Sequence, residues 1–259
     1  MQFKLTTLAA AAVASLFVAG SAYAQSCGND AGGFAAWKQD FAQQAKAAGV
    51  KTRGLQALAG AQYAAATIRV DRAVKKAFSG DVNSFMKRRG GAAIISRGKK
   101  LKQQNASLFA DIERKYGVPA GPLLAIWGME TGFGAAMGKQ NTISAITTLA
   151  YDCRRPAFFT PHAIAALKLV DRGILTSASV GAAHGEMGHT QFLPGNALQY
   201  GVGNLRDRDA ALRSTANFLR GHGYSGGPAS ANRGAIAGWN SASVYQQAII
   251  IMADAIDGE

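Results

Sequence analysis

The sequence contains only two cysteines, six prolines and four glutamates among its 259 residues. Two cysteines are too few for a disulfide-dense scaffold, or for a zinc or iron–sulfur site built from four cysteines. The few prolines, without any Gly-x-y period, exclude a collagen-like chain, although glycine is abundant at 31 residues. Hydrophobic residues make up 48% of the chain, which excludes wholesale disorder and allows one core or a core split between two lobes.

Long hydrophobic runs are also missing, except at the N-terminus. Lys4 is the only charged residue of the first 24, an apolar stretch over 5–19 follows, and Ala22-Tyr23-Ala24 has the small-x-small pattern that signal peptidase cleaves. A membrane anchor is the alternative, but the stretch is short for a span of about 20 residues, and polar Gln25-Ser26 follow at once. We therefore predict that residues 1–24 are a signal peptide, cleaved after Ala24, and that the mature protein is exported.

The two cysteines form a natural pair in an oxidising compartment. Cys27 and Cys153 are far apart in the sequence, so a disulfide between them would close a loop of more than a hundred residues and stabilise the fold by roughly 4 kcal/mol in the chain-entropy model. Two free buried thiols are the alternative. Lipidation of Cys27 is a further one, but the residues before it do not form a lipobox.

Helical spacing of apolar residues recurs along the chain, whereas strand-like alternation is scarce. Phe34, Trp37 and Phe41 share one face of a predicted helix that ends at Gly49. Thr160-Pro161 has the pattern of an N-cap followed by a first helical residue, and Gly173 that of a helix stop. These patterns predict a mainly α fold with minimal β content.

Two further helices are predicted in the C-terminal third. One carries Leu212, Thr215 and Leu219 on a single face and ends at Gly221. The last begins after Asn240-Ser241 and has one face formed by Val244, Ala248, Ile251 and Ala255. Between them, the stretch Gly223–Gly238 is rich in Gly, Ser, Ala and Asn and is predicted to be a loop.

Positive charge is concentrated in one segment. The chain has a net charge of +13, and residues 69–102 hold eleven Lys and Arg but only two Asp. A solvated face is one interpretation, and attraction to a polyanion is the other. Nucleic acid is not the expected partner, because the chain is predicted to be exported and aromatic residues for base stacking are not interleaved with the charges. The anionic cell envelope is the polyanion that fits an exported protein.

Glutamate is scarce, so each of the four can be considered separately. Glu259 is terminal, and Glu113 lies in the solvated helix turn Asp-Ile-Glu-Arg-Lys. Glu130, in contrast, ends the apolar segment Gly121–Glu130, in which Pro122 suits the first helical position. Leu123, Ile126, Trp127 and Glu130 fall on one helix face.

A carboxyl group in that position is expected to stay protonated. Desolvation and the negative end of the helix dipole both disfavour the anion, and thus raise the pKa of Glu130 as a general acid requires. The alternatives are a glutamate at a frayed helix end or one paired with an arginine.

The segment Gly185–Gly195 is the second candidate for a functional site. Its glycines allow the backbone to approach a ligand closely, and Gln191 offers both a donor and an acceptor. An ordinary loop is the alternative. His184, Glu186 and His189 do not have zinc-site spacing, because the histidines are five residues apart and do not share a helix face. We therefore expect no metal site.

Six segments form an ordered set of motifs: Tyr116–Pro119, Ala125–Gly134, Thr148–Phe159, Gly185–Pro194, Thr215–Gly223 and Trp239–Tyr245. Over about residues 33–256 the chain closely resembles the lytic murein transglycosylase B family, which is the second type of soluble lytic transglycosylase domain and glycoside hydrolase family 103. The resemblance implies a lysozyme-like helical catalytic core, which we assign to residues 101–259, and an N-terminal helical lobe over 25–100.

The resemblance also implies cleavage of the β-1,4 bond between N-acetylmuramic acid (MurNAc) and N-acetylglucosamine (GlcNAc) in peptidoglycan. Glu130 would protonate the glycosidic oxygen and then, as a base, activate the C6 hydroxyl that closes a 1,6-anhydro end. No cofactor is implied, and we expect a periplasmic monomer. The implied substrate-binding residues are Met187, Gln191, Phe192, Trp239, Asn240 and Tyr245.

This chain departs from the family pattern at several positions. Ala182 replaces a family serine, Trp239 a tyrosine and Ala242 a serine. The family's calcium-type loop has no oxygen ligands here over residues 201–206, so we expect no bound calcium. A usually long segment is reduced to Ser225–Gly238. A peptidoglycan-binding protein that is catalytically weak or inactive is therefore the alternative to a transglycosylase, and a hydrolytic muramidase is a third.

Overall fold

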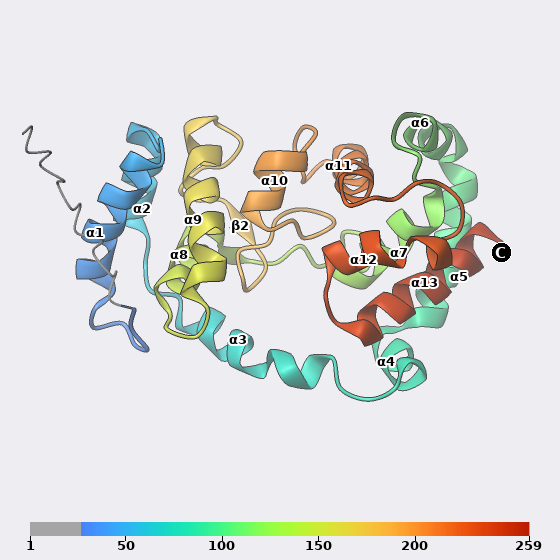
Figure 1. The fold of residues 1–259 in the computed structure, drawn as a ribbon, viewed down its shortest axis with the longest axis horizontal. Coiled ribbons are helices and arrows are strands. Elements are labelled where there is room, and N and C mark those ends of the chain that lie inside the picture. The colour runs from blue at the N-terminus through green and yellow to red at the C-terminus, as the bar shows by residue number, and fades with distance from the viewer. Residues whose placement is uncertain (1–26, 259) are drawn as a thin grey trace, which may run out of the picture.

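The computed structural model describes residues 27–258, and in this part of the chain nearly all regular structure is helical (Figure 1). The mainly α prediction is therefore confirmed. The helices are α1 (Phe34–Ala47), α2 (Thr52–Gly60), α3 (Ala65–Ala77), α4 (Val82–Arg89), α5 (Gly91–Gln104), α6 (Ala106–Tyr116), α7 (Ala120–Thr131), α8 (Thr142–Tyr151), α9 (Pro156–Asp171), α10 (Pro194–Tyr200), α11 (Arg208–Gly221), α12 (Arg233–Trp239) and α13 (Ser243–Asp257), with a 3-10 turn over Ala229–Asn232. The strands β1 (Gln140–Asn141) and β2 (Val180–Gly181) form an antiparallel pair with Gln140 opposite Gly181.

The molecule is elongated, with helices from distant parts of the chain at each end (Figure 1). One end consists of α1, α2, α8 and α9. The other end consists of α4 to α7 with α12 and α13, and α10 and α11 lie between the two. α3 runs along one side and connects the ends. The predicted lobe boundary at residue 100 falls inside α5, which packs against α7 and α13.

Helix α7 lies at the centre of its end of the molecule, and every residue from Ala120 to Gly128 is buried. Its approach to α13 depends on Gly121, where an added Cβ would lie 2.3 Å from the carbonyl oxygen of Ala253. A second close approach occurs at Gly128, where an added Cβ would lie 2.6 Å from the Ile94 side chain. Small residues therefore let α5 and α13 pack directly on the α7 backbone.

Two predicted helix starts are wrong. α7 begins at Ala120 and not at Pro122, and α9 begins at Pro156 and not at Thr160-Pro161. Proline is tolerated throughout the first turn of a helix, where N–H groups have no intrahelical partner, so Pro122 does not mark the first residue. α9 starts at another proline, and its first turn is held by the Arg155 guanidinium, 4.8 Å from the centre of the Phe159 ring.

The C-terminal predictions are partly confirmed. Leu212, Thr215 and Leu219 are buried on α11, but the buried face of α13 contains Tyr245, Ala248, Ile249, Met252 and Ile256, and Ile251 is 43% exposed. The run of apolar residues in α13 covers more than one face, so spacing alone does not identify the inner one.

The predicted loop at 223–238 is wrong in its second half, where α12 forms. Asn232 precedes α12 and anchors the chain there: its side-chain amide donates hydrogen bonds to the carbonyl oxygens of Gly226 and Pro228. Ala235 and Ile236 are then buried.

A disulfide joins Cys27 to Cys153, which confirms the predicted pair and excludes two free thiols. The flanking backbone is paired as well, because the Gly28 amide donates to the Tyr151 carbonyl and the Cys153 amide donates to the Gly28 carbonyl. The predicted signal peptide lies outside the described residues. Within residues 27–258, no helix has the length and apolar character needed to cross a membrane.

Candidate active site

Glu130 occupies the last turn of α7, which ends at Gly132 in the left-handed conformation, with a φ of 58°. The Gly132 amide closes the helix by donating to the Gly128 carbonyl at 3.0 Å. The residues of α7 from Ala120 to Gly128 are buried, whereas Met129 and Glu130 are half-buried. The helix therefore places the Glu130 carboxyl group at the edge of the core.

Two hydrogen-bond donors converge on the same oxygen of this carboxyl group. The Tyr245 hydroxyl donates to Glu130 Oε1 at 2.6 Å, and the Trp239 indole N–H donates to it at 3.2 Å. Within residues 27–258, no hydrogen bond reaches Glu130 Oε2. Because a carboxylic acid can accept two hydrogen bonds at its carbonyl oxygen, this arrangement suits a proton carried on Oε2.

The two donors come from the ends of adjacent helices. Trp239 is the last residue of α12, and Tyr245 lies in the first turn of α13. The Trp239 ring packs edge-on against Phe192 and Phe218, with ring centres 5.0 and 5.1 Å apart. Tyr245 is 3% exposed, so its hydroxyl has little access to water. Packing of the Trp239 and Tyr245 rings therefore orients both donors toward the Glu130 carboxyl group.

The environment raises the pKa of Glu130 to about 7, and burial of its carboxyl group is the main cause. The hydrogen bonds from Tyr245 and Trp239 act in the opposite direction, because they stabilise the carboxylate. The negative charge of Glu186 raises the pKa of Glu130 further, whereas the positive charge of Arg89 lowers it. A carboxyl group with this pKa is protonated in a large fraction of molecules at neutral pH, as a general acid requires.

The 185–195 segment lies next to a donor of Glu130, because Phe192 packs against Trp239. Met187 and Phe192 exchange backbone hydrogen bonds of 2.9 and 3.0 Å across a tight turn. Gln191 closes this turn with a φ of 57°, a left-handed conformation that a non-glycine residue rarely adopts, and its side chain donates to the Gly188 carbonyl. Such strained residues cluster at functional sites, which supports a functional role for the turn.

Two hydrogen bonds of His189 connect this turn to α7. The Trp127 indole N–H donates to His189 Nδ1 at 3.1 Å, and the Thr131 hydroxyl donates to the His189 carbonyl at 2.6 Å. His189 therefore has structural partners on the helix that carries Glu130. Among residues 27–258, no group of three or more His, Cys, Asp or Glu side chains is placed to hold a metal ion.

The predicted site residues are brought together to different degrees. Glu130, Trp239 and Tyr245 are in direct contact, and Phe192 packs against Trp239. Met187 and Phe192 are 5% and 1% exposed, so in this structure they support the site from beneath and do not present a surface to solvent.

The two predicted amide-bearing residues are held by local hydrogen bonds. Gln191 bonds to the backbone of its own turn, and Asn240 Oδ1 accepts from the Ala242 amide at 3.0 Å. Both side chains are half-buried.

Sequence reasoning considered Glu186 as part of the 185–195 segment and of a metal pattern, but missed its partners. Its carboxylate accepts a hydrogen bond from the His184 backbone N–H and lies 3.3 Å from His184 Nδ1, and His184 Nε2 lies 3.3 Å from the buried Asp71 of α3. Asp71 and His184 are more than a hundred residues apart, so no local pattern in the sequence indicates this contact.

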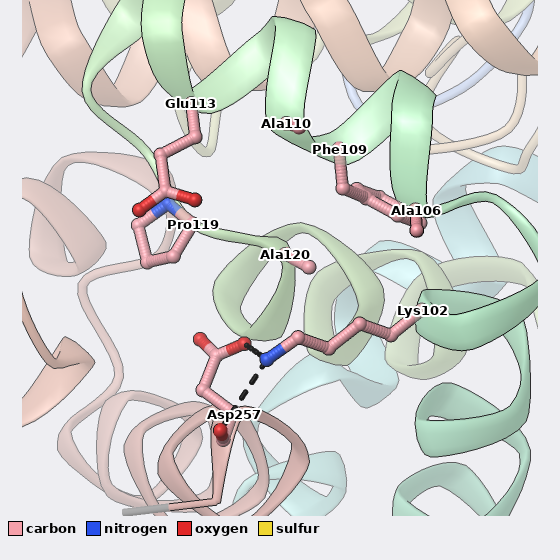
Figure 2. A pocket seen from close by; sticks show the side chains of 8 residues that line it. All are labelled: Lys102, Ala106, Phe109, Ala110, Glu113, Pro119, Ala120 and Asp257. Carbon is pink, nitrogen blue, oxygen red and sulfur yellow. Dashed lines mark hydrogen bonds and ion pairs between the residues drawn. The ribbon is translucent and has the colours of Figure 1, made fainter.

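A separate cavity lies at the opposite end of α7 (Figure 2). Its volume is about 290 Å³, and Lys102, Glu113, Pro119 and Asp257 are among the residues that line it. The Asp257 carboxylate accepts from the Gly121 amide at 3.0 Å and from Lys102 Nζ at 2.7 Å. Asp257 thus occupies the N-terminus of α7, which makes this region a structural anchor for the helix that carries Glu130.

Comparison with known proteins identifies similar folds and sequences. SltB3 from Pseudomonas aeruginosa, solved in complex with NAG-NAM-pentapeptide, is 26% identical and superimposes with a TM-score of 0.78 over 87% of this chain and 80% of its own. Slt35 from Escherichia coli, solved in complex with calcium, is 20% identical with a TM-score of 0.73 over 85% of this chain and 92% of its own, and at this identity shows the fold alone.

Sequence comparison leads to the same family. The membrane-bound lytic murein transglycosylase B of Escherichia coli is 32% identical over 118 residues, which are 42% of this chain and 33% of that protein, so the match spans about a third of the relative's length. The transglycosylase SLT domain model matches residues 33–233, which confirms the resemblance found in the motifs. The chain belongs to the transglycosylase SLT domain family.

Proposed function

We propose that this protein is an exported lytic transglycosylase that cleaves the MurNAc-β-1,4-GlcNAc bond of peptidoglycan glycan strands and leaves 1,6-anhydro-MurNAc ends. The observation that carries the proposal is the Glu130 carboxyl group, half-buried and held by Tyr245 and Trp239 through a single oxygen. Family membership and the likeness to SltB3, which was solved with a peptidoglycan fragment, support the substrate class.

Glu130 acts twice in the proposed reaction. Its Oε2 proton passes to the glycosidic oxygen as the bond between that oxygen and C1 of MurNAc breaks. The resulting carboxylate then takes the proton of the C6 hydroxyl, whose oxygen forms the new bond to C1. Between the two steps Glu130 is an anion, and the donors Tyr245 and Trp239 stabilise that charge without having to move.

The remaining predicted site residues have supporting roles in this proposal. Gln191 and Asn240 contact the glycan or its acetamido group, and Met187 and Phe192 support the wall beneath Trp239. No cofactor is required, because a single carboxyl group supplies both the acid and the base. The protein works as a monomer in this scheme.

The proposed location is the periplasm, after cleavage of a signal peptide behind Ala24. The Cys27–Cys153 disulfide supports export, because disulfides persist in oxidising compartments.

The basic segment 69–102 would add electrostatic attraction to the anionic envelope. Wall binding should then weaken as salt is raised from 50 to 500 mM, because salt screens exposed charges. Binding that is independent of salt would exclude this contribution.

The test is a digest of purified sacculi with the exported chain, residues 25–259, read by mass spectrometry. We compare the wild-type protein with Glu130→Gln and with the matched control Glu113→Gln, which removes an exposed carboxylate on α6. The wild type and the control should release anhydro-muropeptides, and Glu130→Gln should release at least roughly 100-fold less, as is typical for loss of a general acid.

Other outcomes would overturn specific parts of the proposal. Products with reducing ends would identify a hydrolytic muramidase with the same fold. Sedimentation with sacculi but no release of fragments by the wild type would identify a wall-binding protein without catalysis. Equal release by the wild type and Glu130→Gln would exclude Glu130 as the acid.

A further inference from the structure

Two histidines accept hydrogen bonds through Nδ1 along the 187–195 segment. The Trp127 indole N–H donates to His189 Nδ1, and the Gly195 backbone N–H donates to His162 Nδ1, both at 3.1 Å. An indole N–H and a backbone N–H can only donate, so each Nδ1 must carry a lone pair and no proton. Both rings are therefore held as neutral imidazoles that are protonated at Nε2 alone.

The His189 bond connects the segment to α7, the helix that carries Glu130. The ring is packed closely there, because an added Cβ at Gly134 would lie 2.5 Å from His189 Nδ1. An imidazolium would carry a second proton on Nδ1 and would place two N–H groups face to face at 3.1 Å. Protonation of His189 therefore breaks this connection to α7.

The His162 bond holds the other end of the segment. Gly195 is the second residue of α10, and the N–H groups in the first turn of a helix have no intrahelical partner. His162 of α9 supplies the acceptor, and an added Cβ at Gly195 would lie 2.5 Å from its Nδ1. The positive end of the α10 dipole disfavours an imidazolium at this position. This bond too exists only with a neutral ring.

The two bonds flank Phe192, whose ring packs against Trp239, a donor to Glu130. His189 lies three residues before Phe192, and Gly195 lies three residues after it. The hydrogen bonds on both sides of Phe192 therefore fix the surface against which the Trp239 ring packs.

The surroundings of both histidines favour the neutral form. Burial lowers the pKa of His162, and within residues 27–258 it is the one cause of the shift. Burial also lowers the pKa of His189. A hydrogen bond of the His189 ring to the Arg206 backbone and the charge of Asp207 act in the opposite direction, whereas the charges of Arg206 and Arg208 lower the pKa further. The contacts of His189 on α7 are uncharged.

We propose that His162 and His189 are positioning residues that act only as neutral imidazoles: together they hold the 187–195 segment so that Phe192 packs against Trp239, and protonation of either ring releases its end of the segment. The effect on catalysis rests on the proposed function. The loss of the two hydrogen bonds does not, and it can be measured without any substrate.

The two limbs of the pH profile for product release then have different origins. Glu130 must be protonated to act as the acid, so its ionisation, with a pKa of about 7, limits activity on the alkaline side. At lower pH Glu130 stays protonated and produces no acid limb. Protonation of the histidines produces one, in which kcat falls toward roughly tenfold per pH unit below their midpoints.

Tryptophan is scarce enough for a direct measurement of the His189 bond. Residues 25–259 contain three tryptophans, so ¹⁵N-labelled protein has three indole cross-peaks, which single Trp→Phe variants assign. The Gly195 backbone cross-peak reports the His162 bond in the same spectra. The protein is titrated from pH 8 to pH 5, and the ring ¹⁵N shifts of the four histidines give their protonation midpoints.

We expect the Trp127 cross-peak to move with the midpoint of His189 and the Gly195 cross-peak with that of His162, both below the ordinary value of 6.5. The cross-peak of Trp37, which lies on α1, should follow neither midpoint. A histidine ring that becomes protonated while the cross-peak of its donor stays unchanged would overturn the proposal. This titration needs only the wild-type protein.

Matched variants separate the acceptor from its titration. His189→Asn and His162→Asn replace Nδ1 by a carbonyl oxygen, which accepts a hydrogen bond but does not ionise. In each variant the cross-peak of the donor should lose its pH dependence. A cross-peak that still titrates with the wild-type midpoint would show that another group moves it, and would contradict the role of that histidine.

Activity gives a second readout that a merely structural role would not change. For release of anhydro-muropeptides, the ratio of kcat at pH 5.5 to kcat at pH 7.5 should be at least roughly fivefold higher in the His162→Asn, His189→Asn double variant than in the wild type. His189→Leu removes the acceptor and should lower kcat at both pH values. Equal ratios in the double variant and the wild type would contradict the proposal. If the wild type releases no products, the proposed function fails, but the cross-peak titration still decides whether protonation breaks the two bonds.

Discussion

The Tyr245 hydroxyl and the Glu130 carboxyl group, 115 residues apart in the chain, form a 2.6 Å hydrogen bond in the protein interior. This bond stabilises the carboxylate form and so lowers the pKa of Glu130, against the larger effect of burial. Burial, together with the contact with Glu130, raises the pKa of the Tyr245 hydroxyl well above its ordinary value, so this hydroxyl stays a donor across the physiological range. The strength of the acid is therefore set by opposing contributions from its neighbours.

The first prediction concerns Tyr245→Phe, which removes the hydroxyl and keeps the ring. Loss of a hydrogen bond to the charged form should raise the pKa of Glu130 further, by roughly one pH unit. The alkaline limb of the activity profile should move to higher pH, and kcat should fall because the carboxylate formed after proton donation is less stabilised. The pH profile of product release measures both effects.

Tyr63→Phe is the matched control, because the Tyr63 hydroxyl bonds to the Asn29 carbonyl on α1's side of the molecule, away from Glu130. Its profile should equal that of the wild type. An unchanged profile in Tyr245→Phe would show that the hydroxyl does not act on the acid.

The second prediction is a pH-dependent gain of stability in Glu130→Gln. The pKa of Glu130 is about 7 in the folded protein and 4.5 ordinarily, a difference that corresponds to about 3 kcal/mol. Below pH 4.5 the Glu130 carboxyl group is protonated in both the folded and the unfolded state, so it does not lower the free energy of unfolding. As pH rises through 4.5 toward 7 the unfolded state ionises first, so the free energy of unfolding of the wild type falls, and the full cost is present above pH 7.

Glutamine cannot ionise and avoids this cost. Glu130→Gln should therefore be several degrees more stable than the wild type at pH 8 and about equally stable at pH 4.5, as measured by thermal unfolding in matched buffers. A difference in Tm that does not change with pH would contradict the raised pKa of Glu130.

The third prediction tests the packing that positions α7. Gly121→Ala should destabilise the protein by about 1–3 kcal/mol, because the added Cβ would lie 2.3 Å from the Ala253 carbonyl oxygen and a backbone must shift. Gly234→Ala on α12 is the control, since an added Cβ there meets nothing within 4 Å. The control should be neutral or slightly stabilising. Equal Tm values for the two variants would show that α7 and α13 can move apart enough to admit the Cβ without loss of stability.

The fourth prediction concerns the disulfide. Reduction of Cys27–Cys153, or its replacement in a Cys27→Ser, Cys153→Ser double variant, should lower the free energy of unfolding by roughly 5 kcal/mol in the chain-entropy model, because the closed loop spans 126 residues. The double variant should have the same Tm with and without reductant, whereas the wild type should lose stability only when reductant is added. A reduced wild type with an unchanged Tm would show that the backbone pairing of Gly28 with residues 151–153 suffices.

Helix content was predictable from the sequence, but helix starts and faces were less so. Phe34, Trp37 and Phe41 are buried on α1 as their spacing predicts, because only small or polar residues separate them and no other face carries large apolar side chains. α13 is apolar on several sides, so the choice of its inner face depends on what packs against it, namely α7, α5 and α4. The prolines of α7 and α9 were misleading because proline fits several positions of a first turn.

The sequence by itself determined that Glu130 is the candidate acid, because it is one of four glutamates and follows a continuous apolar segment that must be buried. Only the tertiary structure decided which groups contact it: Trp239 and Tyr245 come from segments 109 and 115 residues away. The physical reason is that burial of a helix can be inferred from its own residues. The pKa of a carboxyl group, in contrast, depends on the donors and charges that packing brings to within a few ångströms of it.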